Sequence, residues 1–355
     1  MTPIPPKTII AMSGGVDSSV AAALMLERGS TCVGVTLKLY GEGSRCCSLK
    51  DVNDAKDTAY RLGIPHYTLN FTEAFENEVI RRFVAVYESG GTPNPCIDCN
   101  RYIKWKALLL RSRQLDFDSV ATGHYARVEK DGSGRALLRR SKDPKKDQTY
   151  VLYALTQEEL ARTVFPLGDM TKEETRKIAL EKEFINAKKE DSQDICFVSG
   201  GDYGAFIETY TGKKYPKGNI VDTEGNVLGS HRGIIRYTIG QRRRLGLALN
   251  YPAYVCAKSA GGNTVTLGPK SSLYSKAFTA SDINLIAVRR IERPMRVTVK
   301  TRYLSKEAGA VAEQTGADSI RVEFDEAARA VTPGQAAVLY DGDYVIGGGT
   351  IDAVE

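Results

Sequence analysis

A glycine-rich turn close to the N-terminus has the residue types and spacing needed to bind a phosphate. The string SGGVDS occupies residues 13–18, after an apolar, β-branched stretch and before an apolar run. A turn between a strand and a helix presents backbone N–H groups beside the positive end of the helix dipole. Glycine has no Cβ to keep a phosphate away from those groups. The string therefore predicts a site for a phosphorylated ligand.

The side chains of this turn suggest further roles. Ser13, Ser18 and Ser19 supply hydroxyl donors, whereas Asp17 cannot bind an anion directly. Asp17 implies either a magnesium ion or a polarised partner. The alternative for the whole turn is an ordinary helix start with no ligand.

Two common nucleotide motifs are absent from this turn. A Walker loop needs a lysine before Ser or Thr, and the dinucleotide fingerprint needs G-x-G-x-x-G. The string at 13–18 instead resembles the pyrophosphate loop of ATP pyrophosphatases. Those enzymes adenylate a carbonyl oxygen, release pyrophosphate and let a nucleophile displace AMP, so the resemblance implies that ATP is bound.

Two of the seven cysteines lie where a thiol could react. Cys99 lies in a proline-broken loop just before a predicted helix, whose N-terminus would lower the pKa of the thiol. Cys196 lies in a second loop, and a doubly wound sheet can bring such loops together. Cys32 and Cys256 fall inside predicted strands, where cysteine usually acts as a small buried hydrophobic residue.

Composition limits the class of protein. A chain of 355 residues with 42% apolar residues is long enough for two or three domains. The net charge of +6 suits a polyanionic partner. No apolar run approaches the ~18 residues of a membrane span, and the N-terminus lacks a signal-peptide core. Cysteines without a regular framework fit a reducing environment, so we expect a cytoplasmic protein that does not enter membranes.

The elements around the loop alternate between strands and helices. Such alternation predicts a doubly wound, mainly parallel α/β sheet, which binds ligands at the carboxyl ends of its strands. The expected strands are 8–12, 32–39, 66–69 and 119–122, and the expected helices are 16–27, 51–62, 72–87, 103–115, 157–162 and 171–183.

Changes in pattern divide the chain into three parts. Residues 1–205 form the expected nucleotide-binding domain, which includes a basic segment at about 135–150 and a loop entering a strand at 191–198. A small central domain is expected at 206–274. Short strands and turns at 275–355 predict a C-terminal β-barrel.

The chain resembles the tRNA-specific 2-thiouridylases over essentially its whole length. That family uses ATP and a persulfide sulfur to convert the wobble uridine of some tRNAs to 2-thiouridine. The strings that carry the resemblance, in the family's order, are AMSGGVDS (11–18), TPNP with Cys99 and Asn100 (92–100), ATGHYA (121–126), KDQTY (146–150), DICF (194–197), YTIGQRR (237–243) and TPGQ (332–335).

The resemblance implies roles for individual residues. The catalytic nucleophile would be Cys99, and the persulfide would form on Cys196. The ATP-binding residues would be Ala11, Met12, Ser13, Gly14, Gly15, Val16, Asp17, Ser18, Leu37 and Gly123. The residues at the flipped target base would be Asn94, Pro95 and Cys96, and those contacting tRNA would be His124, Lys146, Asp147, Gln148, Arg302, Tyr303 and Gln335.

The implied partners are a tRNA and a sulfur donor. The tRNAs would be those with a wobble uridine for Lys, Glu and Gln. The donor would be a cysteine desulfurase or a sulfur-relay protein, and the enzyme would act as a monomer with ATP and Mg²⁺. Base flipping is expected because the uridine must leave the stack to be reached. Arg and Lys at 139–146 and 242–244 would contact phosphates.

One departure from the family pattern raises a second possibility. Many family members have Asp three positions before the nucleophile, where this chain has Cys96. The resulting Cys96-x-x-Cys99, together with Cys196, offers three thiolates for an iron–sulfur cluster with one open iron. Cys46 and Cys47 could add ligands. No second C-x-x-C completes a closed site, so we assign no metal ligand, and a cluster-dependent thiolation stays open.

Two other functions remain as alternatives at this point. One is another pyrophosphate-loop enzyme, such as an amide-forming synthetase or argininosuccinate synthase. The paired loop cysteines and the C-terminal barrel argue against it. The other is a non-catalytic RNA-binding protein, against which the intact SGGVDS string argues.

Overall fold

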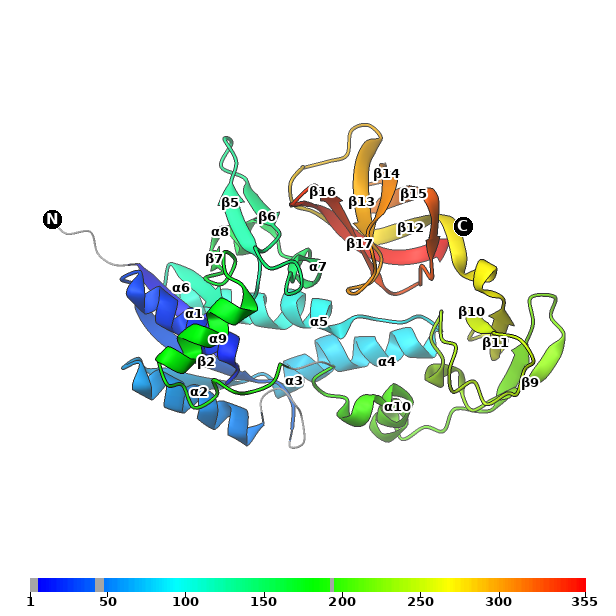
Figure 1. Ribbon diagram of the computed structural model, residues 1–355, viewed down its shortest axis with the longest axis horizontal. Helices are drawn as coiled ribbons and strands as arrows, with labels where there is room; N and C mark the ends of the chain where they lie inside the picture. The colour runs from blue at the N-terminus through cyan, green and yellow to red at the C-terminus, as the bar shows by residue number, and fades with distance from the viewer. Residues whose placement is uncertain (1–5, 42–47, 192–194) are drawn as a thin grey trace. The chain divides into compact units, whose positions relative to one another are not determined.

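The structure is a computed structural model that describes residues 6–41, 48–191 and 195–355. These residues fold into two compact units (Figure 1). The first unit comprises Met1–Val79, Cys96–Ser199 and Asp343–Ile346. The second comprises Ile80–Pro95, Gly200–Gly342 and Gly347–Glu355.

A parallel sheet forms the centre of the first unit. Its strand order is β3-β2-β1-β4-β7, and each neighbouring pair is parallel. The expected doubly wound α/β fold is therefore confirmed. The strands are β1 (Lys7–Ala11), β2 (Thr31–Lys38), β3 (His66–Asn70), β4 (Ser119–Thr122) and β7 (Thr163–Val164).

Helices cover both faces of this sheet. Parallel strands are joined by right-handed crossovers, so the connections running from β1 to β3 lie on one face and α6, which enters β4, lies on the other. Helix α1 is buried on nearly all sides because it packs against both α2 and α9, which explains its alanine-rich sequence. The helices are α1 (Val16–Glu27), α2 (Leu49–Arg61), α6 (Trp105–Gln114), α7 (Thr149–Leu152), α8 (Gln157–Ala161) and α9 (Lys172–Glu181).

The strand order locates the ligand-binding edge. The chain runs outward from β1 through β2 to β3 and then returns to β4 on the other side of β1. In such sheets the crevice lies where the order reverses, at the carboxyl ends of the strands. The loops after β1 and β4 lie at that edge of the sheet, and they contain the glycine turn and Gly123 respectively.

A helical run begins earlier than the sequence predicted. Pro95 starts α5 (Pro95–Asp98), which continues through a π-helical segment, Cys99–Lys104, into α6. The prediction that Cys99 lies in a loop was wrong. Proline suits the first helical position, since its missing N–H has no partner there and its φ is already helical.

Other predicted elements need smaller corrections. The helix expected at 72–87 consists of α3 (Thr72–Phe75), a π-helical turn at Glu76–Ile80 and α4 (Arg81–Glu88). The basic segment contains part of an unpredicted hairpin, β5 (Arg127–Lys130) and β6 (Ala136–Arg139). The strand expected after Ile195 is absent, because a turn there leads to a 3-10 helix at Ser199–Gly201. The DICF string begins at Asp194, outside the described residues.

The second unit combines a helical cluster, a small sheet and a closed barrel. Aromatic side chains join α4 to α10 (Tyr203–Thr211), with Phe83 and Tyr87 against Tyr203. The small sheet has the order β10-β11-β8-β9, and the strands β12-β15-β14-β13-β16-β17 close by pairing of β12 with β17. The strands are β8 (Gly218–Val221), β9 (Val227–His231), β10 (Tyr254–Ser259), β11 (Thr264–Gly268), β12 (Tyr274–Leu285), β13 (Met295–Lys300), β14 (Ala308–Gly316), β15 (Ser319–Arg329), β16 (Ala336–Asp341) and β17 (Tyr344–Val354).

Candidate active site

The two glycines of the turn have different physical reasons to be glycine. Gly14 has φ +71°, and a Cβ there would overlap the backbone carbonyl of Asp51. Gly15 has an ordinary φ of −92°, and its Cβ would meet only the Ser13 hydroxyl, at 3.4 Å. The fold therefore demands glycine at 14 but not at 15. Gly15, at the N-cap of α1, has no side chain that could cap the helix, so the first N–H groups of α1 are not used by a capping side chain of that residue.

Gly123 lies against the start of α1. A Cβ on Gly123 would come within 2.6 Å of the backbone of Asp17 and Ser18. The loop after β4 can approach the glycine turn this closely only with glycine at that position. Leu37, near the end of β2, and Met12 are both buried.

A second layer of residues holds the turn from behind. Asn186 Nδ2 and Lys189 Nζ each donate to the carbonyl oxygen of Gly14 at 3.0 Å. A trans peptide points its N–H away from its C=O, so these bonds direct the Gly15 N–H to the opposite side. Lys189 also binds Asp51 at 2.6 Å and Asp54 at 2.7 Å. Burial disfavours its charge, but the two carboxylates outweigh burial and raise the pKa of Lys189.

The serine hydroxyls serve the turn itself. Ser18 and Ser19 both donate to the carbonyl oxygen of Gly15 at 3.0 Å. Ser19 is fully buried and also accepts from Asn186. Ser13 is exposed, and its hydroxyl lies 3.3 Å from that of Ser18.

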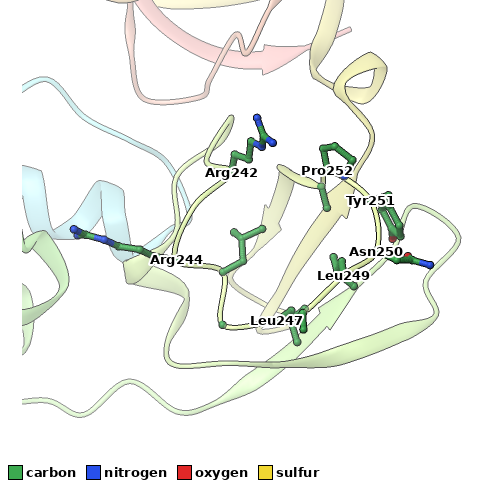
Figure 2. A pocket seen from close by; sticks show the side chains of 11 residues that line it. Arg242, Arg244, Leu247, Leu249, Asn250, Tyr251 and Pro252 are labelled. Atoms are coloured by element: carbon green, nitrogen blue, oxygen red, sulfur yellow. The ribbon is translucent and has the colours of Figure 1, made fainter.

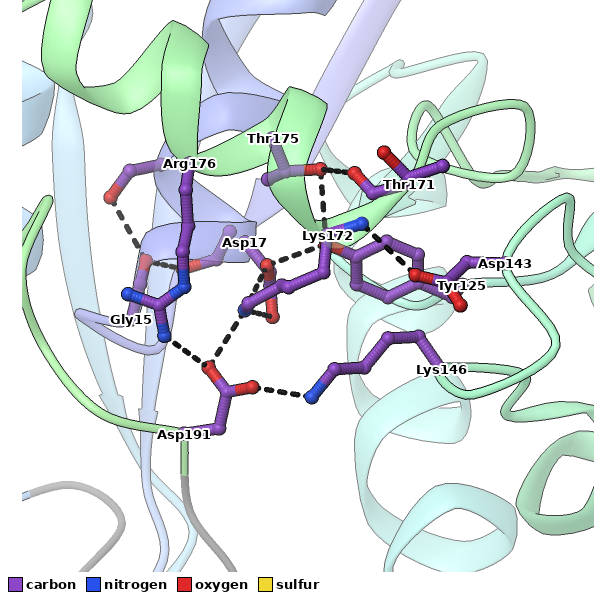
Figure 3. A network of polar contacts seen from close by, with 12 residues as sticks. Gly15, Asp17, Tyr125, Asp143, Lys146, Thr171, Lys172, Thr175, Arg176 and Asp191 are labelled. Carbon is purple, nitrogen blue, oxygen red and sulfur yellow. Dashed lines mark hydrogen bonds and ion pairs between the residues drawn. The ribbon is translucent and has the colours of Figure 1, made fainter.

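Asp17 has a cationic partner within the protein (Figure 3). Lys172 Nζ lies 2.7 and 2.8 Å from its two carboxylate oxygens. The buried Tyr125 hydroxyl donates to the same carboxylate at 2.9 Å and lies 3.0 Å from the Thr175 hydroxyl. Burial, reinforced by the charge of Asp17, raises the pKa of Tyr125 far above its usual value. Asp17 thus has a charged partner within the protein, Lys172.

Asp191 accepts from three cations at once. Lys146 Nζ lies 2.5 Å from it, Lys172 Nζ 2.7 Å and Arg176 Nη2 3.2 Å (Figure 3). Burial would raise the pKa of this carboxyl group, but the bonds from Lys146 and Lys172 outweigh burial and lower it to about 2. Lys172 therefore links the glycine turn to Asp191.

The segment expected to contact tRNA at 146–148 makes internal bonds in this structure. Besides Lys146, the buried Asp147 accepts from the Ser141 backbone and the Thr149 hydroxyl. Gln148 Oε1 accepts from the backbone N–H of Tyr125 at 2.9 Å. The segment thus braces the loop after β4.

His124 is held among aromatic rings. Its Nδ1 lies 2.8 Å from the Thr122 hydroxyl, and its ring packs against Trp105 and Phe165. Burial, with the nearby charge of Lys104, lowers the pKa of His124 well below its usual value. The imidazole is therefore neutral at physiological pH.

The three thiols of the predicted chemistry differ in exposure. Cys99 is buried, Cys196 is half-buried and Cys96 is exposed. Cys99 lies beyond the first turn of the helical run, rather than in a loop just before a helix. Among the described residues, no three His, Cys, Asp or Glu side chains lie together as a metal site. Cys46 and Cys47 lie outside those residues.

The loop before Asn94, which is expected to lie at the target base, is fixed within the second unit. The buried Gln335 donates to the carbonyl oxygens of Thr92 at 2.7 Å and Pro93 at 3.3 Å. Lys258 donates to the carbonyl oxygens of Gly91 and Tyr237. Burial lowers the pKa of Lys258 to about 8.

Two further arginine-containing features belong to the second unit. Arg302, another expected tRNA contact, donates to Ile239 and to the Thr332 hydroxyl. An open pocket of about 660 Å³ is lined by Arg242, Arg244 and residues 245–253. Figure 2 shows Arg242 and Arg244 extending from its rim in different directions.

Sequence reasoning missed the residues that hold the site together. They are Tyr125, Lys172, Arg176, Asn186, Lys189 and Asp191. Lys172 follows the capping residue Thr171 in a charged amphipathic helix, where a lysine normally faces solvent. Tyr125 was noticed only as part of the ATGHYA string. No spacing rule connects Asp17 to a lysine 155 residues away.

A glycine turn at the switch point of a parallel sheet, in a chain that also contains a closed barrel, defines an α/β nucleotide-binding enzyme of the pyrophosphate-loop class. Three family models match the chain: the tRNA methyl transferase HUP domain over residues 6–200, the tRNA methyl transferase PRC-barrel domain over 204–269 and the aminomethyltransferase β-barrel domain over 275–351. The chain belongs to the tRNA-specific 2-thiouridylase family.

Curated relatives match along nearly the full chain. The tRNA-specific 2-thiouridylase MnmA of Acetivibrio thermocellus is 49% identical, with 97% of this chain and 99% of that protein covered. The protein of the same name from Moorella thermoacetica is 50% identical, with 98% and 99% covered. A solved 4-thiouridine synthetase–RNA complex with bound ATP is 17% identical over 54% of this chain and 44% of its own, with a TM-score of 0.36, too low to argue from. No helix in the described part of the chain has the length and apolar character to span a bilayer.

Proposed function

We propose that this protein uses ATP to convert the wobble uridine of tRNA to 2-thiouridine. The observation that carries the proposal is the glycine turn at the switch point of the sheet, closed by Gly123, in a chain of the 2-thiouridylase family. The full-length relatives named tRNA-specific 2-thiouridylase support the substrate. The product set would be 2-thiouridine, AMP and pyrophosphate.

The glycine turn would bind the ATP phosphates through the N–H groups at the start of α1. Asn186 and Lys189 support this role, because they hold the Gly14 carbonyl away from the phosphates. Leu37 and Met12 would contact the adenosine. Oxygen ligands suit Mg²⁺, and Asp17 supplies a carboxylate at the turn. With Mg²⁺ bound, the ion would neutralise phosphate charge.

The thiols would carry sulfur to the activated base. ATP adenylates uridine O2, and pyrophosphate leaves. The outer sulfur of a persulfide on Cys196 bonds to C2, and AMP leaves with the oxygen. The Cys99 thiolate then attacks Sγ of Cys196, which forms a Cys99–Cys196 disulfide and leaves the outer sulfur on the base. Alternatively, Cys99 attacks first and releases that sulfur as sulfide. A thiol reductant restores both cysteines.

The remaining residues would handle RNA. Asn94, Pro95 and Cys96 would surround the flipped base, with His124, Arg302, Tyr303, Gln335 and residues 146–148 as further tRNA contacts. Gln335 and Lys258 support the first role, because they fix the loop that leads to Asn94. The sulfur would come from a persulfide protein such as a cysteine desulfurase, in the reducing cytoplasm where thiols persist.

The direct test is reconstituted thiolation. The full-length protein is incubated with tRNA, ATP and a cysteine desulfurase with cysteine, and nucleosides from the digested tRNA are analysed by mass spectrometry. We expect 2-thiouridine only when both ATP and the donor are present. Formation of 2-thiouridine without ATP would refute the proposal. So would the absence of 2-thiouridine both from the complete mixture and from the tRNA of cells that have this protein as their thiolating enzyme.

A further inference from the structure

Three cations converge on one carboxylate at the edge of the nucleotide crevice. Lys146, Lys172 and Arg176 all contact Asp191 within 3.2 Å, and they come from two separate parts of the chain (Figure 3). Lys172 and Arg176 lie one turn apart on α9, so both side chains leave the same face of the helix. Lys146 reaches the cluster from the loop after β6. We call these three residues the cation cradle.

Among the described residues, the ion pairs of the cradle bring three cations to two carboxylates. Three cations face Asp191 and Asp17, and Lys172 is shared between the two acids. The Lys172 side chain is only 11% exposed, and that of Asp191 is 25% exposed. A site that gathers lysine ammonium and arginine guanidinium groups around one anion matches the chemistry by which proteins hold phosphates.

The cradle also adjoins the glycine turn. Lys172 bonds to Asp17 and Asp191 through the same Nζ atom, at 2.7 Å each. An anion lying on the N–H groups at the start of α1 therefore has these cations as its neighbours. The N–H groups carry only partial charges, so a polyphosphate there needs additional cations.

We propose that the cation cradle is a binding site for the terminal phosphates of the nucleotide, and that the Asp191 carboxylate occupies it until a phosphate displaces it. The inference rests on the proposed function, because it assumes that the glycine turn receives a polyphosphate. Beyond the proposed function, the inference names the side chains that hold the pyrophosphate half of the ligand. It also names a competing group within the protein, the Asp191 carboxylate.

If Asp191 competes with phosphate, the two kinds of variant should change the affinity for an anion in opposite directions. While Asp191 occupies the cradle, only a fraction of the protein molecules can bind an anion, and the apparent affinity for the anion is reduced by that fraction. Asp191→Asn removes the competing charge. Its loss therefore tightens binding of an anion. Lys172→Met removes a bond to the phosphate and weakens binding. If Asp191 only braced the fold, or held a metal ion for the phosphates, Asp191→Asn would leave affinity unchanged or reduce it.

The test is calorimetric titration of the full-length protein with inorganic pyrophosphate in EDTA, so that no metal ion intervenes. We expect Asp191→Asn to bind pyrophosphate about tenfold more tightly than the unchanged protein. Lys172→Met should bind about tenfold or more weakly. An unchanged or weakened affinity in folded Asp191→Asn would overturn the inference, as would an unchanged affinity in Lys172→Met.

Matched controls exclude general charge effects. Lys177→Met removes an exposed lysine from the same helix and should leave pyrophosphate binding unaltered. If Lys172→Met does not fold, Arg176→Met takes its place, because the Arg176 side chain is 35% exposed and is therefore easier to replace. Pyrophosphate binding needs neither tRNA nor sulfur, so a failure here is distinct from a failure of thiolation by the unchanged protein.

Discussion

Glycine residues 14, 15 and 123 show that one residue type serves the site in different ways. Gly14 is required by its left-handed backbone and by the carbonyl of Asp51, and Gly123 by the backbone of α1. Gly15 has neither constraint, since its φ is −92° and its side is open to the Ser13 hydroxyl alone. Of these three glycines, Gly15 is the one that the fold does not require, so a ligand is the reason that we propose for glycine at this position.

This difference predicts separate outcomes for two valine substitutions. Gly15→Val should fold, because valine adopts this φ without strain, yet lose about tenfold or more in ATP affinity as the Cβ branches block the N–H groups. Gly14→Val should lose thermal stability instead. Circular dichroism melting and calorimetric ATP titration measure the two effects. An unchanged ATP affinity in folded Gly15→Val would count against the nucleotide site.

The cysteines provide a second prediction for single residues. Cys196→Ser should lose persulfide loading and thiolation but still adenylate tRNA, and Cys99→Ser should load sulfur without transferring it. Cys96→Ser distinguishes thiol chemistry from a cluster, because an exposed thiol outside the transfer path can be lost with substantial activity remaining. Mass spectrometry of the protein and of tRNA nucleosides reports each step. The thiol scheme fails if Cys196→Ser still makes 2-thiouridine from a persulfide donor.

Local rules predicted the glycine turn but not its partners. The turn and α1 could be recognised because glycine and the apolar run constrain the backbone over a few residues. Lys172 and Asp191 could not, because their meeting with Asp17 depends on how α9 and the segment after it pack against α1. The prediction that a helix begins just after Cys99 was wrong for a related reason. Proline was read as ending structure, although Pro95 begins a helical run.

At the scale of elements, the loop at 90–93 is held by bonds from residues far along the chain. Gln335 binds Thr92 and Pro93, Pro333 accepts from the Thr92 N–H at 3.0 Å, and Lys258 binds Gly91. The sequence marked TPGQ only as a family string. In the structure, Gln335 of this string fixes the loop that leads into α5.

Burial of Lys258 predicts a measurable dependence of stability on pH. Its pKa of about 8 when folded lies below the unfolded value of 10.5, so between these pH values the unfolded chain holds the extra proton. Stability of the unchanged protein relative to Lys258→Met should therefore rise with pH across this window, by at most about 3 kcal/mol. The groups facing Nζ are the Gly91 and Tyr237 carbonyls and the Tyr87 ring.

Thermal melting from pH 7 to pH 10.5 follows this difference. The matched control is Lys276→Met, which removes an exposed lysine whose Nζ binds a backbone oxygen of Asp325. The stability difference between the unchanged protein and Lys258→Met should rise with pH. The difference between the unchanged protein and Lys276→Met should not change with pH. A constant difference between the unchanged protein and Lys258→Met over the window would show that the lysine is not neutral when folded.

Across the whole molecule, ion pairs neutralise one of the two basic runs more than the other, and the less neutralised run is the better candidate for RNA contact. Arg139 pairs with Asp343, Arg140 with Asp147 and Lys146 with Asp191, so much of the basic segment at 135–150 is neutralised within the first unit. Arg242, Arg243 and Arg244 are exposed in the second unit, and among the described residues no ion pair is found for them. Sequence alone could not rank the two runs, because counting charges does not reveal their partners.

The last prediction concerns this exposed arginine run. Changing Arg242, Arg243 and Arg244 to glutamate should weaken tRNA binding and leave ATP binding unchanged, since each lost phosphate contact also removes about one unit from the slope of log affinity against log salt. Filter binding of tRNA from 50 to 300 mM salt, about the range where such contacts dominate, measures both the affinity and the slope. Arg321→Glu serves as the control, because Arg321 is already paired with Glu323 and Glu355 on the barrel. An unaltered slope in the triple variant would exclude this run from the tRNA-binding surface and leave the partly neutralised segment at 135–150 as the main source of electrostatic attraction.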